Sequence, residues 1–270
     1  MSVGSDLVQT KSKAHSVGLA FGNFRDYGGY PSRFGGHVQR DRLYRSGHLA
    51  GGTADDVERL LQMDFKLIAD LRYGHERKDQ PSPWPGHYDD RLLMHEGTDT
   101  SDAPHVAVMR SGAFDEAAVY RFYVHYYSEM ATEQGYQLLF AKFLQTLCVT
   151  QGRSLIHCSA GKDRTGLLAA LVNHILGVDE ETILADFMLS RNGAWIDAMV
   201  PEIERRLREK IGRAIPRHIV VKMLDVEEDY LKAAFTSIKS KWNSIDAFLE
   251  FLGIGASSKA ALRQQLLVAV

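Results

Sequence analysis

Short apolar runs alternate along the chain with longer segments in which apolar residues recur at helical spacing. Four runs have the length and composition of buried strands, and they lie at residues 43–45, 66–71, 91–95 and 153–158. Helical spacing dominates in other segments, at residues 53–63, 114–147 and 164–176. Strands that alternate with helices predict an α/β fold with a central, mostly parallel sheet flanked by helices.

The last third of the chain is predicted to be entirely helical and to pack on one side of the sheet. Gly177 is expected to end the helix at 164–176, and Asp179 to cap the helix that follows it. Pro201 suits the first position of another helix. Further helices are predicted at residues 218–237, 245–252 and 258–268.

The pattern gives no reason to divide the chain into several domains. The first 20 residues are polar and are predicted to form a flexible N-terminal arm. After them there is no internal repeat, low-complexity tract or long linker. We therefore expect residues 21–270 to form a single domain, which is long enough to bury a large core.

Composition and charge narrow the class of protein. Hydrophobic residues make up 45% of the chain, as in ordinary globular proteins, and the formal net charge of −2 gives no basis for nucleic-acid binding. No apolar run approaches the roughly 20 residues of a membrane span, which argues against integral membrane association. The N-terminus lacks the apolar segment of a signal peptide, so a cytoplasmic location is expected, with export by a route that needs no cleaved signal as the alternative.

The two cysteines, Cys148 and Cys158, are too few for a disulfide framework. Cys148 lies in an apolar helical stretch and is expected to pack in the core, with a reversible disulfide to Cys158 as the alternative. No pair of histidines has the spacing of metal ligands, so neither a metal nor another cofactor is expected.

The residues from His157 to Gly166, His-Cys-Ser-Ala-Gly-Lys-Asp-Arg-Thr-Gly, carry the most specific chemical signal in the chain. They join the end of a predicted strand to the start of a predicted helix. Backbone N–H groups converge at such a junction, and the helix dipole favours an anion there. The same field favours a thiolate at Cys158, and Arg164 can hold two phosphate oxygens in its planar fork. These features together predict phosphoryl transfer through a phosphocysteine intermediate.

The other loop residues also have predicted roles. His157 is placed to orient the loop through its ring nitrogens, Gly161 lets the backbone approach the anion, and Thr165 places a hydroxyl near the nucleophilic sulfur. Lys162 and Asp163 are expected at the rim of the loop, where Lys162 would add positive charge for a substrate with more than one anionic group. The predicted phosphate-binding set is Ser159, Ala160, Gly161, Lys162, Asp163, Arg164 and Thr165.

This loop resembles the signature of the protein tyrosine phosphatase superfamily, and its Gly-Lys-Asp-Arg-Thr-Gly version resembles the bacterial tyrosine/serine phosphatase family. Further matches to that family are Asn-Phe-Arg-Asp-Tyr-Gly-Gly-Tyr at 23–30, Arg-Ser-Gly at 45–47, Asp-Leu-Arg at 70–72 and Asp-Phe-Met-Leu-Ser at 186–190. The resemblance covers roughly residues 21–255. It implies a phosphatase fold with Cys158 as nucleophile and Arg164 as phosphate clamp, in a family that includes dual-specificity and phosphoinositide-active enzymes.

The resemblance leaves the general acid open. Relatives in the wider superfamily carry an acidic Asp after a Trp-Pro pair, but in this chain Gly86 follows Trp84-Pro85. The acid is expected to be Asp70 at a strand end or Asp163 in the loop. Asp163 is slightly preferred, because a carboxylate next to Arg164 lies within reach of the departing oxygen.

Both candidates for the acid have a structural alternative. Asp70 could be the partner of Arg72 or Arg45, and Asp163 could face solvent or fix Lys162. If neither is the acid, the next candidates lie in the polar segment 97–105 and are Asp99 and Asp102.

The sequence thus predicts a cysteine-dependent phosphomonoester hydrolase. Its favoured substrate is phosphotyrosine on a protein or peptide, with phosphoserine or phosphothreonine as further substrates. The main alternative is a phosphoinositide or inositol-phosphate phosphatase, which Lys162 favours. A rhodanese-type sulfurtransferase is disfavoured by the five-residue gap between Cys158 and Arg164, and a non-catalytic phospho-binding module usually lacks one of these two residues.

Overall fold

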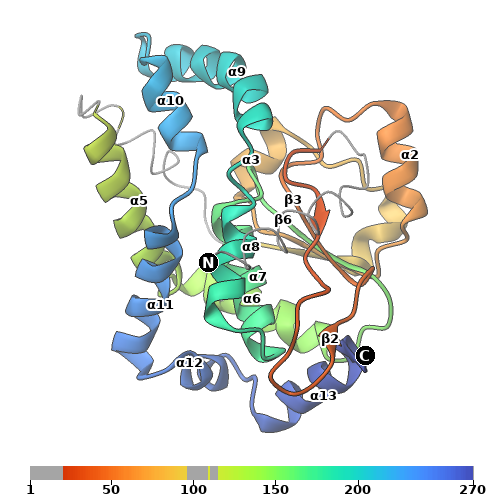
Figure 1. Ribbon diagram of the computed structural model, residues 1–270. Coiled ribbons are helices and arrows are strands. Elements are labelled where there is room, and N and C mark those ends of the chain that lie inside the picture. Colours follow the sequence, from red (N-terminus) through yellow and green to blue (C-terminus); the bar gives the residue numbers. More distant parts are fainter. Residues whose placement is uncertain (1–20, 96–108, 110–114, 270) are drawn as a thin grey trace, which may run out of the picture.

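The computed structural model describes residues 21–95, 109 and 115–269. Figure 1 shows how these residues are arranged. The predicted N-terminal arm, residues 1–20, lies outside the described residues, as do Asp99 and Asp102.

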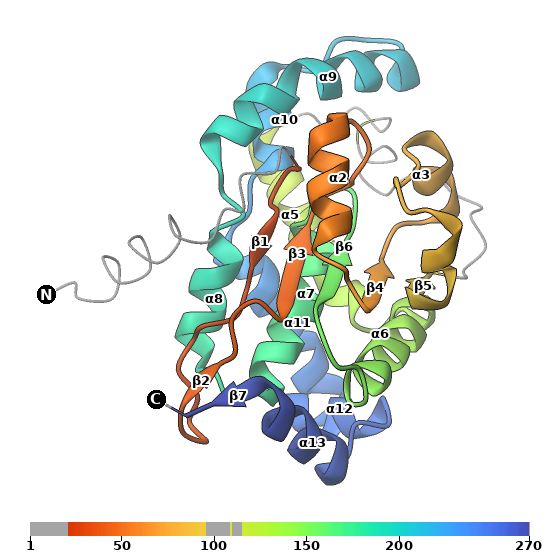
Figure 2. The same cartoon turned by 90° about the vertical axis from the view of Figure 1, so that its right-hand side faces the viewer.

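A five-stranded sheet lies at the centre of the molecule, in the order β1-β3-β6-β4-β5 (Figure 2). Its strands are β1 (Arg25–Asp26), β3 (Leu43–Ser46), β4 (Leu67–Asp70), β5 (Leu92–Met94) and β6 (Ser154–His157). The strands β3, β6, β4 and β5 run parallel, and β1 pairs antiparallel with β3 at one edge. The predicted mostly parallel sheet is therefore confirmed.

Alternate residues of the central strands pack into different cores. Leu67, Ala69 and Ile156 face the larger core, whereas Ile68 and Leu155 face the smaller one. Such double burial explains why these strands are apolar on both faces. The smaller core is covered by α2 (Ala54–Gln62) and by the short 3-10 helix η1 (Gly86–Arg91).

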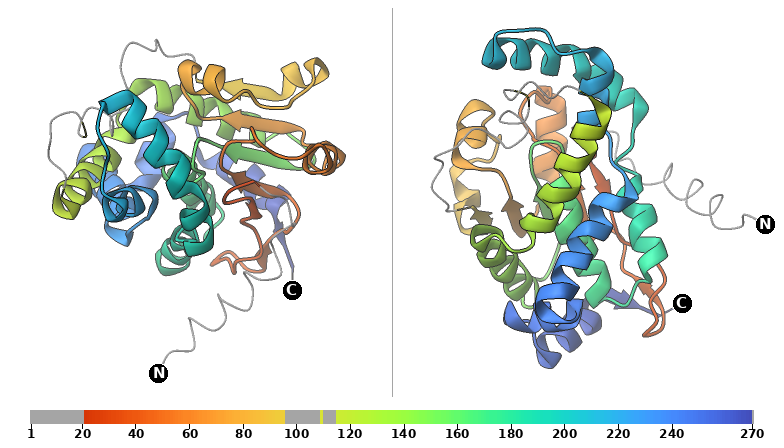
Figure 3. Two further views of the ribbon diagram at one scale, coloured as in Figure 1. Left: turned by 90° about the horizontal axis from the view of Figure 1, so that it is seen from above. Right: turned by 90° about the vertical axis from the view of Figure 1, so that its left-hand side faces the viewer.

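The larger core lies between the sheet and a thick helical layer, which Figure 3 shows beside the strands. The helices of this layer are α5 (Glu116–Met130), α6 (Gln134–Leu147), α7 (Asp163–Ile175), α8 (Glu180–Met188), α9 (Gly193–Ile211), α10 (Arg217–Leu224), α11 (Glu228–Trp242), α12 (Ile245–Phe251) and α13 (Ala256–Leu266). The predicted helical C-terminal part is thus confirmed. In α7 the residues Leu167 to Val172 are all buried, as expected of a central helix covered on every side.

Three helix predictions in this region were wrong in their boundaries. Pro201 lies inside α9 rather than at its start, because Asn192 caps the helix and the buried Ile196 and Val200 anchor its first turns. Pro201 is exposed, and so is Asp197, whose carbonyl has no N–H partner at position 201.

The segment predicted as one helix at 218–237 forms two, α10 and α11. They are separated at Asp225, whose backbone is extended. The predicted last helix ends at Leu266, and β7 (Leu267–Val268) follows it and pairs antiparallel with β2 (His37–Val38). Within the described ranges, no helix has both the length and the apolar character needed to cross a membrane.

The register of the parallel strands brings their carboxyl ends together. Ser46 at the end of β3 and Asp70 at the end of β4 are both paired with His157 at the end of β6. Loops that follow these strands therefore meet at one edge of the sheet, and α7 begins there.

Candidate active site

The loop between β6 and α7 holds the predicted nucleophile. Cys158 follows the last residue of β6, and only 1% of it is exposed. The backbone N–H of Gly161 donates toward its sulfur, with N and Sγ 3.3 Å apart. The helix α7 begins at Asp163 without a side-chain cap, so its N-terminal N–H groups face the loop beside this sulfur.

Three consecutive carbonyl groups of the loop are held on its outer side by residues of the N-terminal segment and of the end of β3. The contacts are His48 N to Ser159 O at 3.0 Å, Asn23 Nδ2 to Ala160 O at 2.7 Å, and Arg45 Nη2 to Gly161 O at 3.0 Å. In a trans peptide the N–H points away from the carbonyl oxygen. The three contacts therefore fix the orientation of the N–H groups that follow these carbonyls, and among these the N–H of Gly161 reaches the sulfur.

Gly161 is required for this loop conformation. Its φ is +70°, and a Cβ at this position would lie 2.4 Å from the backbone nitrogen of Gly47. Arg45, which holds its carbonyl, is fully buried and is balanced by the carboxylate of Asp186 at 2.8 Å. The Tyr30 hydroxyl donates to the same carboxylate at 3.0 Å.

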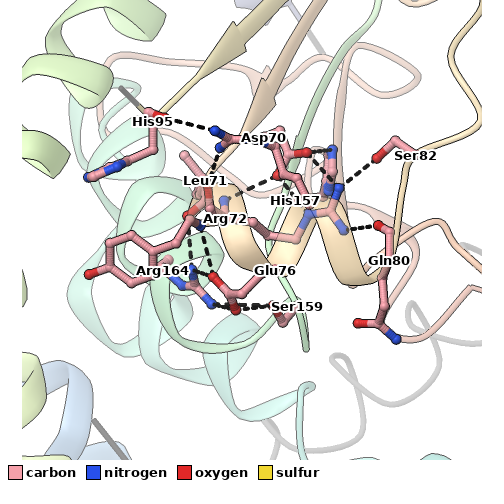
Figure 4. Close-up of polar contacts among 12 residues, drawn as sticks. Asp70, Leu71, Arg72, Glu76, Gln80, Ser82, His95, His157, Ser159 and Arg164 are labelled. Carbon is pink, nitrogen blue, oxygen red and sulfur yellow. Dashed lines mark hydrogen bonds and ion pairs between the residues drawn. The ribbon is translucent and has the colours of Figure 1, made fainter. Parts of the chain in front are cut away.

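Arg164 is oriented by a carboxylate that the sequence did not single out as a site residue. Its two terminal nitrogens bind the two oxygens of Glu76 at 2.6 and 2.7 Å, and one of them also donates to the Leu71 carbonyl at 3.0 Å (Figure 4). Such a bidentate, charge-assisted pair fixes the plane of the guanidinium. Within the described chain no group accepts a hydrogen bond from Nε of Arg164, which leaves that N–H for a ligand.

Glu76 lies in the first turn of α3 (Gly74–Asp79), where its carboxylate also accepts a hydrogen bond from the backbone N–H of Tyr73 at 2.8 Å. The Ser159 hydroxyl donates to it as well. Burial raises the pKa of the Glu76 carboxyl, but the charge and hydrogen bonds of Arg164 outweigh burial and hold the pKa well below its usual range. Glu76 is therefore ionised at neutral pH and orients Arg164 before a phosphate binds.

Asp70 is bound on both oxygens by Arg72, at 2.8 Å from Nε and 2.7 Å from Nη2 (Figure 4). Both side chains are almost fully buried. Burial raises the pKa of Asp70, but the neighbouring His157 and Arg72 more than offset this effect, so the pKa lies below its usual value. An ionised carboxylate with both oxygens occupied has no proton to give to a leaving group. The geometry therefore favours the structural interpretation of Asp70, as a partner of Arg72.

His157 is fully buried beside Asp70, with Nε2 3.7 Å from a carboxylate oxygen. Burial lowers its pKa to about 4, so the ring is neutral at physiological pH. Neither ring nitrogen forms a hydrogen bond with a described residue. The predicted orientation of the loop through these nitrogens stays a prediction.

Lys162 does not lie at the rim as predicted, because only 2% of it is exposed. Its ammonium donates to the carbonyl oxygens of Met223 at 2.6 Å and Asp225 at 3.0 Å, and it lies 4.3 Å from the centre of the Tyr123 ring. These contacts tie the loop to the end of α10. The ammonium is therefore not free to bind a second anionic group of the substrate, which is the role that the sequence predicted for it.

Asp163 and Thr165 lie in the first turn of α7. Asp163 is partly exposed, lines the cavity described below and accepts a hydrogen bond from Tyr127. Thr165 is fully buried, and no hydrogen bond from its hydroxyl to a described residue is present. Its contact with the Cys158 sulfur stays a prediction.

A cavity of about 230 Å³ opens above the loop. Its floor is polar and is formed by Glu76, Ser159, Ala160, Lys162, Asp163 and Arg164. Its walls are largely apolar, come from α5, α9 and α10, and are formed by Phe122, Tyr123, Tyr126, Trp195, Met199, Ile203, Leu207, Met223 and Leu224. The remaining lining residues flank the opening with polar or charged groups and are His48, Tyr73, His75, Asp79, Gln80, Arg206 and Lys210. This arrangement suits a phosphate on the floor and an apolar group above it.

Several residues of this site were missed by sequence reasoning. Asn23 lies in a segment that already stood out for its resemblance to a family, and Glu76 lies shortly after another, but nothing in their spacing assigns them a contact. Tyr127 belongs to an aromatic-rich helix, which the pattern alone assigns to the core. No cluster of three or more His, Cys, Asp or Glu side chains suited to a metal ion is present in the part of the chain that the structure describes.

Comparison with known proteins agrees with this geometry. The tyrosine phosphatase family matches residues 19–268. A protein of Cupriavidus necator described as a tyrosine-protein phosphatase is 30% identical over 230 residues, which cover 84% of this chain and 80% of that protein. The triple specificity protein phosphatase PtpB of Mycobacterium tuberculosis is 27% identical over 279 residues, with coverage of 91% and 96%.

Proposed function

The chain belongs to the tyrosine phosphatase family and is a protein-tyrosine phosphatase, and on this premise we propose that it acts through a phosphocysteine at Cys158 with Asp163 as the general acid. In the first step the Cys158 thiolate attacks phosphorus while the leaving oxygen takes a proton from Asp163. In the second step Asp163 takes a proton from water, which attacks phosphorus, and Cys158 leaves as thiolate while phosphate is released.

The observation that carries this proposal is the fixed loop around Cys158, whose Gly161 N–H donates to the sulfur. Because the carbonyls of Ser159, Ala160 and Gly161 are bound, the N–H groups that follow them keep one orientation before substrate arrives. Donors aimed in advance at developing charge are the largest source of stabilisation in many enzymes. Arg164, held by Glu76, adds its Nε–H and a fixed positive charge beside this loop.

The nucleophile is tested by Cys158→Ser. We expect turnover to be lost, because a serine hydroxyl stays protonated where the thiolate is ionised, while binding of inorganic phosphate persists. Rapid quenching of the native enzyme with a phosphorus-labelled substrate should trap an acid-stable phosphoenzyme that the variant does not form. Turnover by Cys158→Ser at close to the native rate would contradict the phosphocysteine mechanism.

The acid is tested by the leaving group. Asp163→Asn should lower kcat on phosphotyrosine by about 10²–10⁴-fold, and much less on p-nitrophenyl phosphate, whose leaving group departs without a proton. Asp70→Asn should instead lower both activities together, since it disrupts the pair with Arg72. If Asp70→Asn shows the leaving-group dependence and Asp163→Asn lowers both activities together, the acid is Asp70.

The shape of the cavity favours phosphotyrosine as the substrate. Its aromatic and aliphatic walls suit a phenyl ring, and the same cavity also admits the smaller phosphoserine and phosphothreonine side chains, so we propose dual specificity with a preference for phosphotyrosine. The second candidate, a phosphoinositide, loses the support of Lys162 but keeps Arg206 and Lys210 at the opening. Comparing kcat/KM for phosphotyrosyl, phosphoseryl and phosphothreonyl peptides and a soluble phosphoinositide decides between these substrates.

A further inference from the structure

A tyrosine from a distant part of the chain contacts the carboxylate proposed as the acid. The Tyr127 hydroxyl, on α5, donates a hydrogen bond to Oδ1 of Asp163 at 2.8 Å. The Lys162 ammonium lies 3.5 Å from the same oxygen. Across the described ranges, no hydrogen bond or ion pair reaches Oδ2. The two oxygens of Asp163 are therefore in different environments: one is anchored, and the other is left to face the leaving oxygen of the substrate.

Tyr127 is itself held firmly. Its side chain is fully buried, its ring packs edge-on against Phe187 at 6.0 Å between centroids, and Tyr230 lies 5.7 Å away on another side. Burial, followed by the nearby Asp163, raises the pKa of the Tyr127 hydroxyl well above its ordinary value. Tyr127 therefore remains a hydrogen-bond donor throughout the pH range in which the enzyme works.

Lys162 cannot take over this role. Its ammonium already donates to two backbone carbonyls at 2.6 and 3.0 Å, and its distance of 3.5 Å from Asp163 is too long for a strong hydrogen bond. Tyr127 makes the shorter contact and approaches from a separate element.

We propose that Tyr127 is a positioning residue that anchors Oδ1 of Asp163 and directs Oδ2 toward the leaving oxygen of the substrate. This inference rests on the proposed role of Asp163 as the acid. The anchor explains how a carboxylate that is partly exposed in the first turn of a helix keeps one orientation. A general acid held in a fixed position transfers its proton without first being ordered.

The test compares Tyr127→Phe with Tyr230→Phe. Tyr230 is a matched control because it is buried in the same aromatic cluster, and its hydroxyl has no hydrogen-bond partner among the described residues. Tyr127→Phe should lower kcat on a phosphotyrosyl peptide about tenfold, the effect of one hydrogen bond to a charged group, with little change in KM. Its kcat on p-nitrophenyl phosphate should change little. Tyr230→Phe should show none of these effects.

A double variant separates positioning from a general loss of packing. On the Asp163→Asn background, Tyr127→Phe should cause no further leaving-group-dependent loss, because the group it positions is already gone. If Tyr127→Phe lowers kcat equally on both substrates, or if its leaving-group-dependent loss persists in the Asp163→Asn variant, Tyr127 does not position the acid. Either result leaves Asp163 as the acid. If Asp163→Asn itself shows no leaving-group dependence, the proposed acid fails, and the role of Tyr127 fails with it.

Discussion

At the scale of single residues, Glu76 shows how one carboxylate can serve two purposes. It completes the N-terminal cap of α3 through Tyr73, and it holds Arg164 in the plane needed for a phosphate. Because the low pKa of Glu76 keeps it charged, Arg164 retains both a partner and an orientation in the free enzyme. The phosphate clamp is therefore arranged by a residue that need not touch phosphate itself.

We expect Glu76→Gln to lower kcat/KM for phosphotyrosine about 10- to 100-fold, since an amide offers Arg164 one acceptor and turns a donor toward its second N–H. Inhibition by inorganic phosphate should weaken in parallel. Glu116→Gln, in the exposed first turn of α5, is the control and should match the native enzyme. Equal kinetics for the two variants would show that Arg164 does not depend on Glu76.

His157 should give the fold a measurable dependence on pH. In the unfolded chain this histidine takes up a proton near pH 6.5, but in the folded protein burial lowers its pKa to about 4. Between these values the unfolded state binds more protons, so the free energy of unfolding falls as the pH falls, by ~3 kcal/mol over the whole window.

Denaturant titrations across this window should therefore show a smaller loss of stability on acidification for His157→Gln than for the native protein. His125→Gln, at an exposed position of α5, should keep the native slope. His48 and His174 also have lowered pKa values and contribute to both curves, so the difference between the curves isolates His157. An unchanged slope in His157→Gln would mean that its ring is protonated in the folded state.

At the scale of elements, the phosphate loop is shaped by the segment that precedes β1 and by the end of β3. Neither element carries the nucleophile, yet Asn23, Arg45 and His48 together bind three carbonyls of the loop. The loop is therefore held by elements far away in the sequence, which bind its carbonyl groups and so fix the orientation of the N–H groups that follow them.

Asn23→Ala should accordingly weaken inhibition by inorganic phosphate about tenfold, because the Ala160 carbonyl loses its donor and the loop can turn. A loss of stability alone would not have this effect. The comparison is Ser244→Ala, which removes the N-cap of α12, destabilises the fold by about 1 kcal/mol and leaves the loop contacts in place. The idea fails if phosphate binding in Asn23→Ala equals that of Ser244→Ala.

At the scale of the whole molecule, the cavity joins two parts of the chain with different chemistry. The loops at the carboxyl ends of the central strands supply its polar floor, and the helices α5, α9 and α10 supply most of its apolar walls. On the proposed mechanism the floor binds the phosphate of any ester, so selection among substrates falls to the walls.

Ile203→Ala tests this division. It removes apolar surface from the wall on α9 and should lower kcat/KM for a phosphotyrosyl peptide roughly tenfold, with a smaller effect on a phosphoseryl peptide that reaches less of the wall. Ile211→Ala is the control, because Ile211 packs on the core from the same helix but does not line the cavity. Similar losses on both peptides would indicate that α9 acts on the loop rather than on the substrate.

The sequence by itself determined the central strands, the helix after the loop, the α/β class and the family, because buried strands, a buried helix and a Cys-to-Arg loop each leave a local pattern. It also predicted Cys158 as the nucleophile and Arg164 as the phosphate clamp, since their chemistry depends on their own side chains and on a junction between neighbouring elements. Local pattern was less reliable at helix ends. Pro201 suggested a start, but burial of Ile196 and Val200, which depends on the folded core, moved that start to Gly193.

Only the tertiary structure decided which partners surround the loop. Asp70 and Asp163 are equivalent as carboxylates in the sequence. They differ once Arg72 occupies both oxygens of Asp70 and the cavity reaches Asp163. The sequence predicted that Lys162 lies at the rim of the loop. In the structure the carbonyls at the end of α10 bind its ammonium, and nothing in the sequence shows this contact. Such contacts join residues far apart in the chain, so they depend on how the elements pack, and no local pattern records that packing.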